Sequence, residues 1–492
     1  METILLGIQD ALSLSILVVV FAGVLLGIVV GAIPGLNAPM AIAIAIPLTY
    51  YMSPLAALAF LISVNKGGSF GGSISGILLN TPGSPEAAAT AIDGHPLAKA
   101  GYPMKAMKTA LGASVVGDFL SDVVLILVAA PLAVIALKLG PVEIMGLIVF
   151  AFAMISGLLG SSVAKGLIAT ALGIFFACIG TDPTMSMPRL DFGSIELQSG
   201  IPLMALGIGM LAVSEILVQI EQHIRGTGTT TQQGFERAPD DRLTLREFFS
   251  MWRTLLRSAA IGTGIGALPG LGATIAGFLG YGAARRASKN PEKFGRGAVE
   301  GVAGAEAANS AVVGANLIPL LALGIPGNVT AALLVGAFII HGFAPGPWMF
   351  EDHGRLIYGM FAAMVIANVL NLVIGTFGLP LFAKVLAIPK AIILPALVFL
   401  GLTGSFLNDQ SFFAVGLTVA FAVLGYLMRK LGYPFVPFII GFVLTPMLEL
   451  SFSQAYILTE GSIANLVEYP VSLAFLVLTV VVIVRAIVRG RP

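Results

Sequence analysis

The chain has 492 residues, of which 57% are hydrophobic and only 10% are charged, whereas a soluble domain carries about 25% charged residues. This composition argues against a soluble globular protein and predicts a polytopic α-helical membrane protein. The net charge of +1, with basic residues scattered over short loops, gives no support to nucleic-acid binding. The single cysteine, Cys178, excludes an internal disulfide and a cysteine-based metal site.

Apolar runs long enough to cross a bilayer recur from end to end, and we expect about 12 membrane spans. The N-terminal METILLGIQDALS has no Lys or Arg and lacks the basic region of a signal peptide, so the first retained helix is expected from Leu12 onward. This terminus carries only Glu2 and Asp10 as charges and is expected outside. The polar, arginine-rich segment 221–257 is expected to be a cytoplasmic linker.

The linker divides the chain into a first membrane repeat, 1–220, and a second, 258–492, which also holds additional C-terminal helices. GAIPGL at residues 31–36 returns as GALPGL 235 positions later. NTPGSPEAAAT at residues 80–90 matches GIPGNVTAALL 244 positions later. Because the first copy follows an outer terminus and the second follows an inner linker, we expect inverted repeats of the kind found in secondary transporters.

Each repeat contains two Pro-Gly pairs within apolar sequence. Proline lacks an N–H and glycine readily adopts a positive φ, so we expect broken helices or re-entrant hairpins there. In hydrocarbon, an open helix end survives only where protein or a water-filled cavity supplies hydrogen-bond partners. N–H groups at a helix start attract anions, and free carbonyls attract cations. We therefore expect a substrate site near the membrane midplane. The alternative is that the Pro-Gly pairs simply kink or turn the helices.

Small polar residues beside the breaks supply the hydroxyls and amides that a carboxylate needs. One charged residue, Lys66, lies between apolar segments, where it either offsets substrate charge or reaches the membrane interface from a helix end. The predicted substrate-binding residues are Pro34, Gly35, Asn37, Lys66, Asn80, Thr81, Pro82, Gly83, Ser84, Pro269, Gly270, Gly272, Thr274, Pro326, Gly327, Asn328 and Thr330.

Glu306 occupies the comparable place in the second repeat, as a proton or cation ligand or as the partner of a basic side chain. The candidates for binding a coupling ion are Asn65, Glu306, Asn309, Ser310 and Asn316. Asp118 and Asp122 share one helix face and are expected near a helix end. Residues 93–96, DGHP, are expected to form an aqueous turn.

Enzyme motifs find no structural context in this sequence. Residues 67–71 fit G-x-S-x-G, but that motif needs an α/β sheet and a histidine partner. No Walker A sequence and no Cys/His metal spacing occurs, so we expect no enzyme activity, no cofactor and no bound metal other than Na⁺. An anion channel and an intramembrane enzyme are the competing function classes. A channel predicts uncoupled currents, and an enzyme predicts a catalytic pair on facing helices.

Three long stretches carry a family resemblance: GAIPGLNAPMAIAIAIPLTYYMSPLAALAFL, GGSFGGSISGILLNTPGSPEAAATAIDGHPLAKAG and GIGALPGLGATIAGFLGYGAARRASKNPEKFGRGAVEGVAGAEAANSA. They resemble the large membrane subunit of tripartite tricarboxylate transporters, the TctA family. The resemblance extends over nearly the whole chain and weakens after Leu400. The family often has Tyr where His95 stands, which changes one residue of the expected turn.

The resemblance implies import of carboxylates across the bacterial inner membrane by symport with Na⁺ or H⁺. It implies two protein partners, a small four-helix membrane subunit and a periplasmic substrate-binding protein. Citrate and other tricarboxylates are the implied substrates. Dicarboxylates and aromatic carboxylates, which other members of the family import, are the alternatives.

Overall fold

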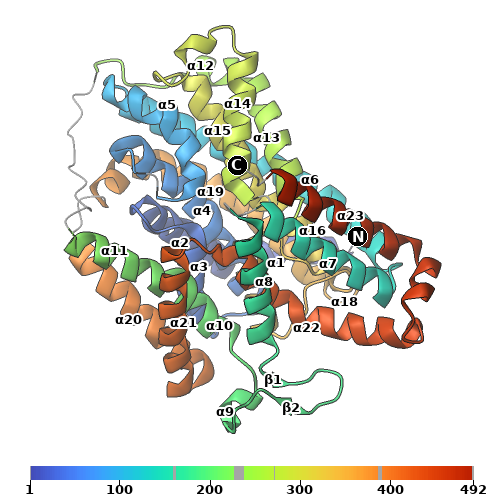
Figure 1. Cartoon of the computed structure of the whole chain (residues 1–492). Coiled ribbons are helices and arrows are strands. Elements are labelled where there is room, and N and C mark those ends of the chain that lie inside the picture. The colour runs from blue at the N-terminus through green and yellow to red at the C-terminus, as the bar shows by residue number, and fades with distance from the viewer. Residues whose placement is uncertain are drawn as a thin grey trace.

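The computed structural model describes residues 2–81, 83–158, 162–225, 238–270, 272–385 and 390–489. These residues form helices with one short β-hairpin, which confirms the all-α class (Figure 1). Among them, eight helical stretches are long and apolar enough to cross a membrane, and five shorter apolar helices have 10–17 residues. The chain is therefore a multi-pass membrane protein, while the number of about 12 spans stays a prediction.

The first part of the chain contributes two of the eight candidate spans, Leu14–Ala32 and Pro103–Ala136. A short helix precedes the first of them, so the expected start at Leu12 misses one element. In chain order the elements are α1 (Glu2–Ala11), α2 (Leu14–Ala32), α3 (Ala38–Thr49), α4 (Pro54–Leu79), η1 (Pro85–Ala87), α5 (Ala88–Lys99) and α6 (Pro103–Ala136).

A second group of elements leads to the middle of the chain and contains the β-hairpin, whose strands pair antiparallel. These are α7 (Pro141–Leu158), α8 (Val163–Ala177), β1 (Gly180–Thr181), β2 (Pro188–Arg189), α9 (Ile195–Gln198), α10 (Leu203–Gly207), the π-helical η2 (Ile208–Val213) and α11 (Ser214–Ile224). Of the predicted linker, residues 226–237 lie outside the described residues.

The second half also combines long helices with interrupted ones. Its elements are α12 (Leu245–Ser250), α13 (Trp252–Gly266), α14 (Gly272–Ala287), η3 (Pro291–Lys293), α15 (Val299–Ala315), α16 (Leu317–Leu323), α17 (Val329–Ile340), α18 (Met349–Asp352) and α19 (Gly354–Val385). The chain continues with α20 (Lys390–Asp409), α21 (Phe412–Lys430), α22 (Phe435–Leu458), η4 (Ile463–Glu468) and α23 (Pro470–Arg489).

The long helices pack into a central body with two flanking groups. In the centre, α2 lies against α4, while α15 lies against α6, α13 and α14. One flanking group contains α11, α20 and α21, and the other contains α7, α8, α22 and α23 (Figure 1). The hairpin β1–β2 and α9 project at the end of the molecule opposite α12 (Figure 1). The largest buried apolar cluster joins α3 and α4 to α16, α17 and α22.

The helix breaks predicted at the Pro-Gly pairs are confirmed. Helix α2 ends at Ala32 and α3 begins at Ala38, while α13 ends at Gly266 and α14 begins at Gly272. The turn glycines Gly35 and Gly270 have φ of 87° and 89°, a conformation that residues with a side chain rarely adopt. Each apolar run is thus interrupted and continues as a second helix after the turn.

Two local predictions are wrong. Residues 93–96 do not form an aqueous turn but lie within α5, because Asp93 has partners that the local sequence does not show. Its Oδ1 accepts hydrogen bonds from the backbone N–H groups of Gly295, Gly297 and Ala298. Asp118 and Asp122 are not near a helix end but in the middle of α6, where both are fully buried.

Candidate functional site

A cavity of about 150 Å³, called here the main cavity, lies where the interrupted helices of both halves meet. Its wall combines the starts of α3, η1, α14 and α17 with residues from the end of α21 and the start of α22. The lining residues predicted from the sequence are Asn37, Gly270, Gly272, Thr274, Gly327, Asn328 and Thr330. Asn37 is therefore brought together with residues that lie 233 to 293 positions later in the chain.

Two asparagines fix the geometry of this wall. Asn37 is the N-cap of α3, and its Oδ1 accepts a hydrogen bond of 3.0 Å from the Met40 N–H. Asn328 is the N-cap of α17, and its Oδ1 accepts one of 2.9 Å from the Ala331 N–H. Because only the amide oxygen can accept these bonds, the Nδ2 group of each asparagine is left as a donor. The positive ends of both helix dipoles face the same cavity.

The other predicted substrate residues shape the breaks without lining the main cavity. Pro34, Gly35, Pro269 and Pro326 form turns, and a side chain on Gly35 would overlap the amide of Gln219. Thr81 donates to the carbonyl of Leu79, and Asn80 ends α4 with a left-handed φ of 53°. Gly83 and Ser84 are buried against Gly72 of α4. Pro82 lies outside the described residues.

Arg429 is a lining residue that the sequence analysis missed. It lies in the last turn of α21, and its Nη1 is 2.7 Å from a carboxylate oxygen of Glu215. The guanidinium also stacks on the ring of Phe435, with 4.7 Å between its carbon and the ring centroid. In the sequence, the two basic residues of segment 428–430 indicate only a cytoplasmic position, and no spacing relates them to the Pro-Gly pairs. Arg429 gives the cavity a cation suited to a carboxylate.

Of the coupling-ion candidates, Asn65 and Asn316 line a second cavity of about 20 Å³, called here the small cavity. Glu306 is buried in α15, and one of its oxygens accepts hydrogen bonds from Ser73 and Thr90, of 2.6 and 2.7 Å. Hydroxyls, rather than the basic partner that was one alternative, therefore hold this carboxylate.

The remaining two coupling-ion candidates lie beside Glu306 on α15. Asn309 Nδ2 is 3.5 Å from the Ser69 hydroxyl, and Ser310 shares a hydrogen bond of 2.7 Å with Ser114. Neither Asn309 nor Ser310 lines the main or the small cavity, and both connect helices of the two halves.

Lys66 lies outside both cavity linings, in a buried polar network. Its ammonium group is 2.8 Å from Asp122, 2.9 Å from Asn368 and 3.6 Å from Asp118. Asn368 also donates to Asp122 over 2.7 Å. Because the Lys66 side chain is fully buried, the alternative that it reaches the membrane interface is wrong. The network joins α4, α6 and α19.

Close helix contacts recur in the two halves with the sequence offsets of the motifs. Gly27 of α2 lies against the Val64 carbonyl of α4, and Gly262 of α13 lies against the Ala308 carbonyl of α15. The first members of these pairs are 235 positions apart, and the second members 244. The same offsets relate Gly31–Gly68 to Gly266–Val312, and Gly83–Gly31 to Gly327–Gly266. These matched contacts favour the predicted repeats, whose inverted relation stays a prediction.

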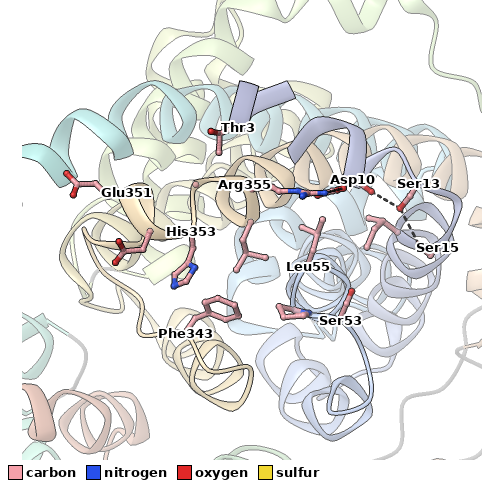
Figure 2. A pocket seen from close by; sticks show the side chains of 15 residues that line it. Thr3, Asp10, Ser13, Ser15, Ser53, Leu55, Phe343, Glu351, His353 and Arg355 are labelled. Atoms are coloured by element: carbon pink, nitrogen blue, oxygen red, sulfur yellow. Dashed lines mark hydrogen bonds and ion pairs between the residues drawn. The ribbon is translucent and has the colours of Figure 1, made fainter. Parts of the chain in front are cut away.

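A larger cavity, of about 590 Å³, lies away from the helix breaks, between α1, α18 and the starts of α2, α4 and α19. Figure 2 shows Arg355 directed at Asp10 across it, with Nε and Nη2 donating over 2.6 and 2.8 Å. These hydrogen bonds lower the pKa of Asp10 below its ordinary value. None of the predicted site residues lines this cavity, so the main cavity is the better candidate despite its smaller volume.

Comparison with known proteins finds relatives over nearly the whole chain. The chain is 34% identical over 482 residues to an uncharacterized 52.8 kDa protein in the TAR-I ttuC′ 3′ region of Agrobacterium vitis, covering 98% of this chain and 95% of that protein. It is 37% identical over 226 residues to an uncharacterized protein in the TAR-II ttuC′ 3′ region of Agrobacterium vitis, covering 46% and 93%. No solved structure matches. Residues 17–440 match the tripartite tricarboxylate transporter TctA family, and the chain belongs to that family.

Proposed function

We propose that this chain is the large permease subunit of a secondary active importer in the bacterial inner membrane, and that the main cavity binds a carboxylate substrate. The observation that carries this proposal is the convergence of the starts of α3, α14 and α17 with Arg429 on one cavity. Helix starts and a guanidinium both favour a negatively charged group. The name of the family supports a tricarboxylate substrate, and we propose a citrate-like one.

The size of the cavity supports a compact substrate. Pockets for drug-sized ligands have volumes of roughly 300–1,000 Å³, whereas the main cavity has about 150 Å³. This favours a small polycarboxylate over an aromatic carboxylate, and a dicarboxylate remains the closest alternative. The donors on the wall, Asn37 Nδ2, Asn328 Nδ2 and the Arg429 guanidinium, suit several carboxylate oxygens at once.

Import of such a substrate requires a coupling ion. Moving one charge against 100 mV costs about 2.3 kcal/mol, so a trianion entering a negative-inside cell faces roughly 7 kcal/mol per 100 mV. At least three cations, or a protonated substrate, must enter merely to neutralise this charge. We therefore propose symport with Na⁺ or H⁺, without a further cofactor or enzymatic step. An anion channel would instead let the anion leave the cell down its electrochemical gradient.

We propose that the interrupted helices move as hinged or sliding units, with their Pro-Gly turns next to the substrate. A rigid body of this kind exposes the site first to one side and then to the other. We propose that a small four-helix membrane subunit completes the permease and that a periplasmic binding protein delivers the carboxylate. The word tripartite in the name of the family supports two further components.

The first experiment is uptake of labelled citrate into proteoliposomes containing this chain and the small membrane subunit. A Na⁺ or a H⁺ gradient is imposed, with and without the binding protein outside. Accumulation that requires a gradient and the binding protein supports the proposal, and accumulation of another carboxylate changes only the substrate. Leak of many anions without any gradient would establish the channel instead.

A substitution tests the cavity itself. Aspartate caps a helix as well as asparagine does, so Asn37→Asp preserves α3 but places a negative charge beside the substrate. We expect uptake to fall at least about tenfold, because like charges in such a site cost more than 1.4 kcal/mol. The control is Asn290→Asp, at the exposed start of η3. Normal uptake by the Asn37→Asp protein, at equal expression, would remove Asn37 from the site.

A further inference from the structure

The small cavity adjoins the main cavity and shares part of its wall. Pro39, Glu86, Ala273, Asn328 and Thr330 line both. The small cavity continues from there between α4 and the junction of α15 with α16, so that both halves of the chain contribute to it.

The wall of the small cavity is rich in buried oxygen atoms. Asn65, Ser69, Asn316 and Thr330 are each at least nine-tenths buried, with exposed fractions of 5%, 5%, 2% and 4%. The Oδ1 atom of Asn316 is buried without a hydrogen-bond donor in the described part of the chain. A buried polar atom of this kind is costly unless a ligand satisfies it. Glu86 supplies the one carboxylate of this wall.

We propose that the small cavity binds one Na⁺ ion through side-chain oxygens of Asn65, Ser69, Glu86, Asn316 and Thr330. A volume of about 20 Å³ holds one species the size of a water molecule. Amide, hydroxyl and carboxylate oxygens are ligands for a hard cation, and amides and hydroxyls neither gain nor lose a proton near neutral pH. A single carboxylate balances a single positive charge, whereas divalent cations are held by more carboxylates or by substrate phosphates. The proposal rests on the import function proposed above and names its coupling ion.

The shared wall makes binding of the ion and of the substrate interdependent. Without a cation, the carboxylate of Glu86 faces the main cavity and repels an anionic substrate. A Na⁺ ion beside Glu86 cancels that charge and leaves Arg429 and the helix starts to bind the substrate. Na⁺ therefore binds first, and by reciprocity the substrate tightens Na⁺ binding.

The test measures Na⁺ binding without transport. The purified full chain, in complex with its small membrane subunit, is heated while NaCl replaces choline chloride or KCl at constant ionic strength. We expect Tm to rise with Na⁺ and to saturate, because a ligand of the folded state stabilises it by mass action. Citrate should raise Tm further only in NaCl. Asn316→Ala and Ser69→Ala should each raise the half-saturating Na⁺ concentration by about tenfold or more.

Two matched substitutions serve as controls. Asn371→Ala on α19 and Ser472→Ala on α23 remove buried polar groups that line neither cavity, and both should keep the wild-type response to Na⁺. The absence of a saturable Na⁺ effect, or an unchanged effect in both Asn316→Ala and Ser69→Ala, overturns the Na⁺ site. If citrate uptake then proceeds on a H⁺ gradient, the import function stands without it. A Na⁺ effect lost in these variants, in a protein that transports no carboxylate, supports the ion site and overturns the import function.

Discussion

At the scale of single residues, the ammonium group of Lys66 is the centre of a buried network of charged and polar side chains. It is fully buried between Asp122 and Asn368, with Asp118 nearby. Breaking a buried ion pair leaves the other charge without a partner, which costs about 3–5 kcal/mol. We therefore expect Lys66→Met to lower Tm of the purified protein strongly, while Lys66→Met combined with Asp122→Asn loses less.

The matched control is Lys105→Met, near the start of α6. The ion pair of Lys105 with Glu247 is 2.6 Å long, but its side chains are 20% and 34% exposed. Partly exposed pairs contribute about 0–1 kcal/mol, so this substitution should change Tm little. Equal losses in the two lysine variants would show that the buried network contributes no more than an ordinary surface pair.

At the scale of the helix, close glycine contacts hold neighbouring helices together. Gly262 of α13 lies so close to the Ala308 carbonyl of α15 that a methyl group would overlap it, whereas Gly264 has nothing within 4 Å. We expect Gly262→Ala to destabilise the protein by about 1–3 kcal/mol. Gly264→Ala should stabilise α13 by about 0.5–1 kcal/mol through helix propensity. Thermal unfolding of the two proteins compares them, and equal Tm values would contradict the packing described.

The interrupted helices are the part of the fold that could be predicted from the sequence. Proline and glycine act on the backbone of their own segment, so the turns at Gly35 and Gly270 follow from local chemistry. The lining by Asn37 and Asn328 follows as well, since an N-cap stands next to the break it caps. The position of both capping asparagines at the site can thus be predicted from local sequence rules alone.

Other parts of the site depend on contacts between distant segments. Arg429 faces the main cavity only because α21 ends beside the starts of α3 and α17. Asp93 is helical and buried only because a loop 200 residues later donates three N–H groups to it. Glu86 gains its place between the two cavities in the same way. No pattern in a single sequence predicts contacts of this kind between distant segments.

At the scale of the whole molecule, the two ends seen in Figure 1 should face opposite sides of the membrane. The positive-inside rule places α12 in the cytoplasm, and the β1–β2 hairpin lies at the other end. We expect Met187→Cys, at a position 66% exposed in Cys178→Ser background, to react with an impermeant thiol reagent in intact cells. Ser250→Cys should react only after permeabilisation. Labelling of both from the same side would invalidate the assigned orientation.

The two halves of this chain are interleaved rather than placed side by side. Ser73 and Thr90 from the first half hold Glu306 of the second, and α15 lies between α6 and α13. Each half alone would therefore expose polar side chains that are buried in the whole chain. Expressed as two separate polypeptides, 1–225 and 238–492, the halves should be degraded singly and recovered together as a complex, so that neither half is an independent folding unit.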